Sequence, residues 1–387
     1  MITGKKIIVA GIAGRVGSGI GEFFLENGNE VWGYDLFYQA GSREYWDSKG
    51  AHTIAGDFTR GEFDGLPTDA DYCINLAANT MPGNFSVGLR DNALGPALLM
   101  EHCKYAKAFM HFSTCSPYTP TGDPMTVYTE EDAVGSKAEG FYSGAKIAGE
   151  GAVNAMAHIL RLPTVQLRLS VYYGTHGDGG LLSLVYLNNL INHLPIEVIK
   201  KKPSYFSCIY DKDINAFMEP LLNAATTEAP IVNFIADDYL SVEEMVAYMS
   251  ELTGIKPVYK YVDELSWSAM IISPEKRKSI TGPSAYPWKK GVKEFVEYWL
   301  PKLQAEQAIA AKTAVASKVK YTRETRLREI SGLPGIIDFM SKKSGQKVPP
   351  YALKIAGGIT LQKAGAYLKW TDEQIQEVVD ELNSKYK

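Results

Sequence analysis

The chain has 387 residues, of which 45% are hydrophobic and 22% are charged, and its formal net charge is −4. These proportions are typical of a folded globular protein, and the length suits a large α/β unit with one or two smaller parts. The small negative charge gives no reason to expect a nucleic-acid partner, and no apolar run approaches the roughly 18 residues of a membrane span.

The cysteines and histidines show no spacing typical of a metal or redox site. The four cysteines are widely separated along the chain, and the six histidines are scattered. We therefore expect reduced thiols and no bound metal. The sequence enters a predicted strand directly, without the pattern of a signal peptide. We accordingly expect a cytoplasmic protein.

A strand, a glycine-rich turn, a helix and a second strand open the chain. Residues 7–10 are an apolar run long enough for one buried strand. Apolar side chains then recur at helical spacing up to Gly28, and a second strand ends at Asp35. The turn before the helix contains three glycines at a spacing of three, namely Gly11, Gly14 and Gly17.

This unit predicts a diphosphate site, because a helix N-terminus presents unpaired N–H groups and a partial positive charge. Gly11 would make the tight turn, Gly14 would let the diphosphate approach the backbone, and Gly17 would let helix and strand pack closely. Asp35 would accept hydrogen bonds from the adenosine ribose and would repel a 2′-phosphate, which favours NAD over NADP. The nearby cations Arg15 and Arg43 leave NADP open. A glycine-rich turn without a ligand is the alternative interpretation.

Strands and helices continue to alternate along the chain, which predicts a parallel sheet with helices on both faces. Small residues at 77–79 follow one of these strands and would leave room for a ligand. A loop is expected at 117–129, and Ser241 with Glu244 predicts a capping box. The predicted strands are at 52–54, 71–76, 108–113, 164–173 and 230–235, and the predicted helices are at 92–105, 141–160 and 181–194.

A second set of residues has the chemistry of a carbonyl or alcohol site. Tyr142 and Lys146 are four residues apart on a predicted helix and therefore share a face. A nearby ammonium lowers the pKa of a phenol from about 10, so the phenol can act as a general acid or base near neutral pH. Thr114, at the end of a predicted strand, could hydrogen-bond a substrate oxygen.

The Tyr-x-x-x-Lys pattern alone is not specific, since it occurs four times. Tyr142 differs from the others because it follows a strand that ends in Ser-Thr. Pro287 and Pro301 argue against a regular helix around the last two pairs. The three pairs that we interpret as ordinary surface are Tyr45/Lys49, Tyr286/Lys290 and Tyr298/Lys302.

Taken together, these motifs resemble the extended short-chain dehydrogenase/reductase superfamily, the group of NAD-dependent epimerases and dehydratases. The resemblance covers about residues 5–240. It rests on Gly11-x-x-Gly14-x-x-Gly17, Asp35, Asp57-Phe58, Leu76-Ala77-Ala78, Asn92-x-x-Gly95, His111-Phe112-Ser113-Thr114, Tyr142-Ser143-Gly144-Ala145-Lys146, Leu167-Arg168-Leu169 to Tyr173-Gly174, and Asp211-Lys212-Asp213-Ile214.

The resemblance implies an α/β protein with a Rossmann fold, that is, a doubly wound parallel sheet, and a smaller C-terminal substrate lobe. It also implies that NAD is the cofactor and that Lys146 holds the nicotinamide ribose. Two subunits would pair through the helices around Asn92 and Tyr142, so we expect a homodimer. The predicted catalytic residues are Thr114, Tyr142 and Lys146, and the predicted cofactor-binding residues are Gly11, Gly14, Arg15, Val16, Gly17, Asp35, Asp57, Phe58, Leu76, Ala77, Ala78, Tyr142 and Lys146.

The end of the chain exceeds the usual length of this superfamily. A shift in composition near Ala305 and a capping box of Thr371 with Gln374 predict an appended helical tail. The expected parts are an NAD-binding Rossmann domain over 1–174 with the strand near 230–236 returning to it, a substrate-binding lobe mostly over 175–305, and a helical extension over 306–387.

The lobe has no arginine between Gly174 and Ile235, although sugar-nucleotide enzymes of this superfamily often hold the substrate diphosphate with arginines. The lysines at 200–202 could bind phosphate, but a solvated charge run is the favoured interpretation. Aromatic residues of the lobe suit either a less charged substrate or the core, and they are Tyr186, Tyr205, Phe206 and Tyr210.

The residues after Thr114 define the expected subclass. The sugar 4,6-dehydratases of this superfamily carry Asp and Glu there, whereas this chain has Cys115 and Ser116, so we do not expect dehydration. Our leading prediction is an NAD-dependent oxidoreductase that interconverts a ketone or aldehyde and an alcohol, with Tyr142 as the general acid or base. The alternatives are a nucleotide-sugar epimerase with tightly bound NAD and a non-catalytic dinucleotide-sensing protein. The sequence leaves the substrate and the direction of reaction open.

Overall fold

The computed structural model describes residues 2–135, 140–177, 179–200, 203–263, 265 and 269–316. Contacts divide the chain into one unit over Met1–Trp299 and a second over Leu300–Lys387. The described part of the second unit is the end of helix α10 (Trp288–Ala316). The predicted capping box of Thr371 lies outside the described residues, and the predicted domain boundaries stay predictions.

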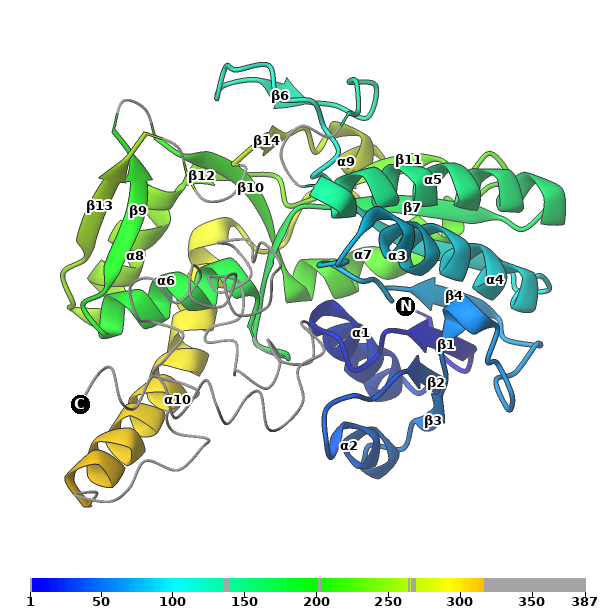
Figure 1. Cartoon of the computed structure of the whole chain (residues 1–387), viewed down its shortest axis with the longest axis horizontal. Coiled ribbons are helices and arrows are strands. Elements are labelled where there is room, and N and C mark those ends of the chain that lie inside the picture. Colours follow the sequence, from blue (N-terminus) through cyan, green and yellow to red (C-terminus); the bar gives the residue numbers. More distant parts are fainter. Residues whose placement is uncertain are drawn as a thin grey trace. The chain divides into compact units, whose positions relative to one another are not determined.

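A seven-stranded parallel sheet forms the centre of the first unit, in the order β11-β7-β5-β4-β1-β2-β3 (Figure 1). The chain order reverses at β1, which has β2 on one side and β4 on the other. Such a switch point opens a crevice at the carboxyl ends of the strands, where ligands bind in sheets of this type. The strands are β1 Lys6–Ala10, β2 Glu30–Asp35, β3 His52–Ala55, β4 Tyr72–Asn75, β5 Ala108–Thr114, β7 Thr164–Leu169 and β11 Ile231–Phe234.

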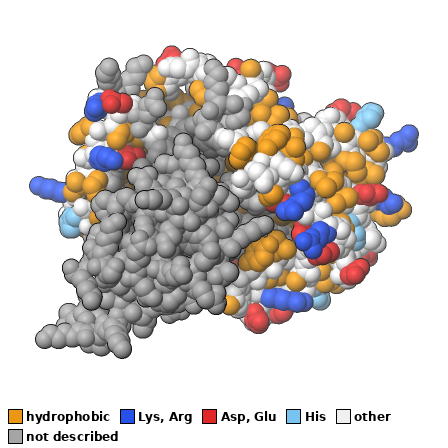
Figure 2. All heavy atoms as spheres, viewed as in Figure 1, with side chains coloured by type: hydrophobic (Ala, Val, Ile, Leu, Met, Phe, Trp, Pro, Cys, Tyr) orange, Lys and Arg blue, Asp and Glu red, His pale blue; other side chains and the backbone are white. Residues whose placement is uncertain are grey.

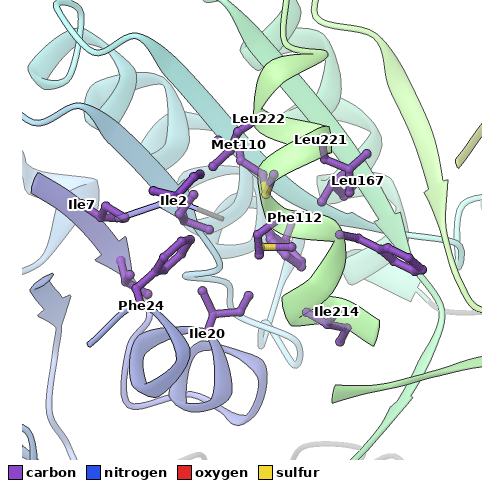
Figure 3. Close-up of a cluster of buried hydrophobic side chains, with 14 of the residues drawn as sticks. Ile2, Ile7, Ile20, Phe24, Met110, Phe112, Leu167, Ile214, Leu221 and Leu222 are labelled. Carbon is purple, nitrogen blue, oxygen red and sulfur yellow. The ribbon is translucent and has the colours of Figure 1, made fainter. Parts of the chain in front are cut away.

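Helices pack on both faces of this sheet, which confirms the doubly wound fold. On one face, Phe24 of α1 (Arg15–Glu26) and Leu221 of α7 (Asp211–Asn223) share a buried cluster with Ile7 (Figure 3). The cluster is apolar and fully enclosed, so its burial contributes most of the stability on this side. The short helix α2 (Ser42–Ser48) adds Trp46 to the same cluster.

The opposite face is covered by α4 (Gly95–His102) and α5 (Gly140–Leu160). Leu99 of α4 and Val153 of α5 pack against Cys73 of β4. The short helix α3 (Phe85–Leu89) also packs on α5. Because both faces are buried, the strands read as nearly continuous apolar runs rather than alternating ones.

The predicted helix at 92–105 begins earlier and is interrupted. Its first part is α3, where the Asn84 side chain accepts a hydrogen bond from Val87 N at 2.9 Å and so caps the helix. A π-helical segment over Arg90–Leu94 follows, and α4 then ends at His102. The expected start at Asn92 is therefore wrong, because Asn92 lies inside the π segment.

The predicted strand at 164–173 is wrong as a single strand. Its first part is β7, in the central sheet, and its second part is β8 (Val171–Tyr173), in a different three-stranded sheet. Between them, Ser170 donates a hydrogen bond to Ser207 O at 2.9 Å. The run is apolar on both sides of this break, so hydrophobicity alone does not mark it.

The remaining elements build smaller sheets and helices after the central strands. The predicted helix at 181–194, the strand at 230–235 and the capping box of Ser241 with Glu244 are confirmed, whereas the predicted loop at 117–129 contains a short strand. These elements are η1 Phe58–Arg60, β6 Val127–Tyr128, α6 Leu181–Ile191, β9 Pro195–Ile199, β10 Tyr205–Tyr210, β12 Tyr239–Ser241, α8 Val242–Thr253, β13 Val258–Val262, β14 Ile271–Ile272 and α9 Glu275–Thr281.

The surface carries charges of both signs. Figure 2 shows acidic and basic side chains interspersed on the described part of one face, as a net charge of −4 leads one to expect. Within the described ranges, no helix combines the length and the apolar character that a membrane span requires.

Candidate active site

The glycine turn lies between β1 and α1, and two of its glycines are required by close backbone contacts. Gly11 has φ = 83°, and a Cβ there would come within 2.7 Å of Ala77 N. A Cβ on Gly17 would overlap the backbone oxygen of Gly11. Gly11 therefore needs glycine for the tight turn, as the sequence predicted, and Gly17, predicted to allow close packing of helix and strand, needs glycine because the helix start lies against the turn backbone.

Gly14 is less crowded than the other two glycines, although a Cβ there would still make a tight backbone contact. The nearest atom to a Cβ built there is Gly11 O, at 3.0 Å. Gly14 is also the N-cap of α1, and no side chain caps the helix at this residue. Arg15 and Val16 form its first turn. The backbone at this helix start fits the approach of an anionic group, which is the role predicted for it.

Asp35, at the end of β2, braces the glycine turn. Its carboxylate accepts hydrogen bonds from Ala13 N at 3.0 Å and from Phe37 N at 3.2 Å. The side chain is only partly buried, and a carboxylate has further lone pairs that can accept ribose hydroxyls. Asp35 thus has a structural contact that sequence reasoning missed, in addition to its predicted ribose contact.

The exits of β3 and β4 bring the other predicted cofactor residues to the same sheet edge. Asp57 caps the short helix after β3 and accepts from Thr59 N at 2.9 Å, while the Phe58 ring is buried against Gly95. After β4, Leu76 N donates to Ala10 O at 2.9 Å. The next residues, Ala77 and Ala78, continue the same exit, and Ala77 lies directly beside Gly11.

A buried asparagine fixes the loop after β4. Asn92 Oδ1 accepts from Asn79 N at 3.2 Å, and Asn92 Nδ2 donates to Asn79 O at 2.9 Å. Asn79 Nδ2 in turn donates to Asp91 at 2.8 Å. The π segment presents Asn92 to this loop, and π segments occur often at functional sites. Sequence reasoning included Asn92 only as the start of a helix and missed this role.

Thr114 ends β5, and its hydroxyl is oriented by a neighbouring amide. Ser116 N donates to Thr114 Oγ1 at 3.3 Å, which leaves the Thr114 hydroxyl hydrogen available for another acceptor. Ser116 Oγ itself accepts from Ser143 Oγ at 3.0 Å. The first turns of α5 therefore lie against the exit of β5, so the structure brings the two predicted catalytic segments together.

Lys146 is buried at the same junction. Its side chain is 1% exposed, and its ammonium donates to Phe112 O at 2.7 Å. Burial lowers the pKa of Lys146 to about 8, and the nearby Glu150 carboxylate opposes part of this effect. Lys146 is therefore mainly charged at neutral pH. Tyr142, four residues earlier, is partly buried in the first turn of α5, and its predicted catalytic role stays a prediction.

The other Tyr-x-x-x-Lys pairs lie outside this junction. Tyr45 and Lys49 are at helix α2. The ammonium of Lys290, in the first turn of α10, lies over the ring of Tyr286, 3.9 Å from its centroid. Contrary to the sequence prediction, Pro301 lies inside α10, so the helix continues through the last pair and loses one backbone hydrogen bond there.

The two residues after Thr114 provide no strong acid. Cys115 is buried, its thiol donates to Arg168 O at 3.1 Å, and burial raises its pKa. Ser116 is a neutral hydroxyl. In the part of the chain that the structure describes, no group of three or more metal-ligating side chains is present.

The predicted aromatic residues of the lobe mostly belong to the core. Tyr186, Phe206 and Tyr210 are buried, and Tyr205 is partly buried. Lys200 pairs with Asp263 at 3.1 Å on the surface, which fits a solvated charge. The other two lysines of that run lie outside the described residues.

Comparison with known proteins gives the chain a family context. The sequence model of the NAD dependent epimerase/dehydratase family matches residues 7–230. The comparison with curated proteins finds no match.

Several solved structures share the fold. A UDP-glucuronic acid 4-epimerase from Bacillus cereus, in complex with NAD, has a TM-score of 0.63 at 19% identity, covering 76% of this chain and 96% of that one. A UDP-glucose 4-epimerase from Thermotoga maritima has a TM-score of 0.63 at 21% identity, covering 77% and 99%. A dTDP-glucose 4,6-dehydratase from Bacillus anthracis, in complex with NAD, has a TM-score of 0.64 at 18% identity, covering 76% and 96%.

Proposed function

The chain belongs to the NAD dependent epimerase/dehydratase family, and from this membership we propose that it is an NAD-dependent oxidoreductase that interconverts a ketone or aldehyde and an alcohol. The observation that carries the proposal is the junction of α5 with β5. Lys146 is fixed there at 2.7 Å from Phe112 O, on the helix face that also carries Tyr142. Thr114 ends the strand that Lys146 contacts.

The residues of the glycine turn fit NAD. The start of α1, which no side chain caps, and the partly buried Asp35 suit a diphosphate and an adenosine ribose. Asp57, Phe58 and the residues 76–78 would line the adenine side and the central part of the cofactor. When bound, NAD supplies the acceptor or donor of a hydride.

The chain's own side chains would handle the proton and the substrate oxygen. Thr114 donates its free hydroxyl hydrogen to that oxygen and orients it. Tyr142 gives a proton to the oxygen in the reductive direction and takes it back in the oxidative direction. Lys146, mainly charged at neutral pH, favours the phenolate form of Tyr142 and holds the nicotinamide ribose.

A nucleotide-sugar epimerase is the second candidate function. It uses the same proton transfer, and the epimerases from Bacillus cereus and Thermotoga maritima match this chain over nearly their whole length. The lack of arginine between Gly174 and Ile235 favours the first candidate. Cys115 and Ser116 offer no carboxylic acid for dehydration, so a dehydratase is not proposed.

We further propose a homodimer in the cytoplasm. Phe85, Leu94 and Phe141 are large apolar side chains, each nearly half exposed, on α3, the π segment and α5. Figure 2 shows hydrophobic side chains gathered over the region where Figure 1 places these helices. In a homodimer, a second copy of the chain packed on this patch would remove these three apolar side chains from water.

Retention of the cofactor separates the two candidates. We would denature the purified protein and identify the released small molecules by mass spectrometry. Stoichiometric NAD supports the epimerase. An empty protein that binds added NADH with micromolar affinity supports the exchanging dehydrogenase, and a protein that neither contains nor binds NAD(H) contradicts both.

A further inference from the structure

A buried ion pair lies directly behind the proposed catalytic face of α5. Glu150 is one helical turn beyond Lys146, and its carboxylate accepts from Arg168 Nε at 2.9 Å and from Arg168 Nη2 at 2.8 Å. It also accepts from Ser113 Oγ at 2.6 Å. Both charged side chains are almost fully buried, at 7% and 4% exposure. A buried pair is costly to form, so its position invites a functional explanation.

The ion pair connects helix α5 to the neighbouring strands β5 and β7 at residues that lie opposite each other in the sheet. Ser113 of β5 is paired in register with Arg168 of β7, and Glu150 reaches both of them from α5. Ser113 directly precedes Thr114, and Lys146 contacts the residue before Ser113. We call Glu150, Arg168 and Ser113 together the Glu150 clamp. This clamp fixes α5 against β5 next to Thr114 and to the Phe112 oxygen that Lys146 contacts.

Other groups hold the clamp rigid. The Arg168 guanidinium lies over the Tyr118 ring, 4.9 Å from its centroid, and Tyr118 OH donates to Asn233 Oδ1 at 2.6 Å. Arg168 O accepts from the Cys115 thiol. Arg168 is thus held from its side chain and its backbone, so the Glu150 carboxylate has little freedom to move.

Among the described residues, the charged groups around this junction besides Lys146 are Glu150, Arg168 and Glu130, and Glu130 accepts from Asn233 N at 2.7 Å on the Tyr118 side. His111 of β5 is fully buried, and burial together with the Lys146 charge lowers its pKa, so it is neutral. Burial raises the pKa of the Cys115 thiol and of the Tyr118 phenol, so both are also neutral. Of these groups, the Glu150 carboxylate favours the charged form of Lys146.

We infer that Glu150 is a positioning residue, which holds the Tyr142–Lys146 face of α5 in register on β5 and supplies the anion that balances the Lys146 ammonium. The inference rests on the proposed function for its catalytic meaning. In this inference the Arg168 guanidinium has two roles, because it orients the Glu150 carboxylate and also offsets the negative charge of that carboxylate. Ser113, the third residue of the clamp, directly precedes Thr114 in the chain and so connects the clamp to it.

The test is the titration of Lys146 in the full chain, followed by NMR with lysine labelled at the ε-carbon. The Lys146 resonance is identified as the one absent from the Lys146→Arg spectrum. Glu150→Gln removes the anion and should lower the midpoint of the Lys146 titration by about one pH unit. Arg168→Gln removes the cation that offsets Glu150 and should raise it. A purely structural role predicts shifts in the same direction, or none, and either result overturns the inference.

Two controls keep the result interpretable. Asp237→Asn breaks a different pair, with the fully buried Arg277, and should lower stability while leaving the Lys146 midpoint unchanged. The double variant Glu150→Gln/Arg168→Gln leaves neither charge of the buried pair without its partner, so it should fold even if a single variant does not, and its Lys146 midpoint should lie between those of the single variants. A midpoint outside that interval, or one shifted by Asp237→Asn, contradicts the inference.

NADH binding by wild type and variants is measured in parallel by fluorescence. If wild type does not bind NADH but the two single variants shift the Lys146 midpoint in opposite directions, the proposed function fails and the clamp stands. If NADH binds and the midpoints do not separate, the clamp fails and the proposed function stands.

Discussion

The Lys146 ammonium donates to the backbone oxygen of Phe112 at 2.7 Å, two residues before Thr114 on the same strand. This contact ties a helix residue and a strand residue that are 34 positions apart in the chain. It holds the Lys146 ammonium close to the end of strand β5. The proposed chemistry of the site depends on this junction and on the glycine turn at β1.

We expect Gly17→Ala to damage the glycine turn. The added Cβ would overlap Gly11 O, so the turn must shift and the free energy of unfolding should fall by about 1–3 kcal/mol. NADH affinity, measured by fluorescence, should fall by about tenfold or more. Gly151→Ala is the matched control, because a Cβ on this glycine of α5 meets nothing within 4 Å. It should keep NADH affinity and gain up to about 1 kcal/mol; equal behaviour of the two variants contradicts this account of the turn.

Asp35→Ala should weaken NADH more than NADPH. The substitution removes the proposed ribose acceptor and also the acceptor for Ala13 N and Phe37 N. We expect a loss of about tenfold or more for NADH in a fluorescence titration. Asp35→Asn keeps one acceptor oxygen and should lose less. An equal loss of affinity for both cofactors would rule out Asp35 as the residue that selects NAD.

His176 should make the protein less stable as the pH rises. Its Nδ1 lies 2.7 Å from Asp211 and its Nε2 lies 3.3 Å from Glu22, and these acids raise its pKa above the ordinary 6.5. The folded state therefore binds the proton more tightly, so this stabilisation is complete below pH 6.5 and is lost as the pH rises through the raised pKa. Thermal unfolding between pH 5.5 and 8.5 should show this slope in wild type and in the exposed-histidine control His52→Gln. A slope that survives unchanged in His176→Gln contradicts the assignment.

Asp213 should have a related effect at lower pH. This carboxyl is fully buried, and burial raises its pKa from 3.8 to about 6. The folded state holds the proton to a higher pH than the unfolded state, so stability falls as the pH rises from 3.8 to 6. Asp213→Asn keeps the acceptor for Ala285 N and removes the charge. We expect chemical denaturation at pH 7.5 to show a gain of about 1–3 kcal/mol, and a loss of stability would show that the charge is needed.

The sequence was sufficient where local chemistry dictates structure. Gly11 is required by its φ of 83° and Gly17 by its contact with Gly11 O, both within the turn, and the order of strands and helices follows from hydrophobic runs and turn residues. It was insufficient where distant segments decide. The break at Ser170 depends on pairing of β8 with β10, and the role of Asn92 depends on the loop at Asn79.

The clamp behind the site shows the same limit. Glu150 on α5 and Arg168 on β7 are 18 residues apart, and only the folded sheet brings Ser113 between them. The one sequence signal was the spacing of four from Tyr142 to Lys146 to Glu150, which places all three on one helix face. That spacing predicts neighbours along the helix, but it does not identify the strand residues that they contact.

The most direct test of the proposed function is turnover by Tyr142→Phe. Wild type is first screened against nucleotide sugars and against ketones and alcohols with NAD(H). On the substrate found, Tyr142→Phe should lose about 100-fold or more in turnover and keep its affinity for NADH, whereas Tyr286→Phe, which changes the tyrosine of another Tyr-x-x-x-Lys pair, should match wild type. Turnover by Tyr142→Phe at the wild-type rate would contradict the proposed role of Tyr142 and with it the mechanism.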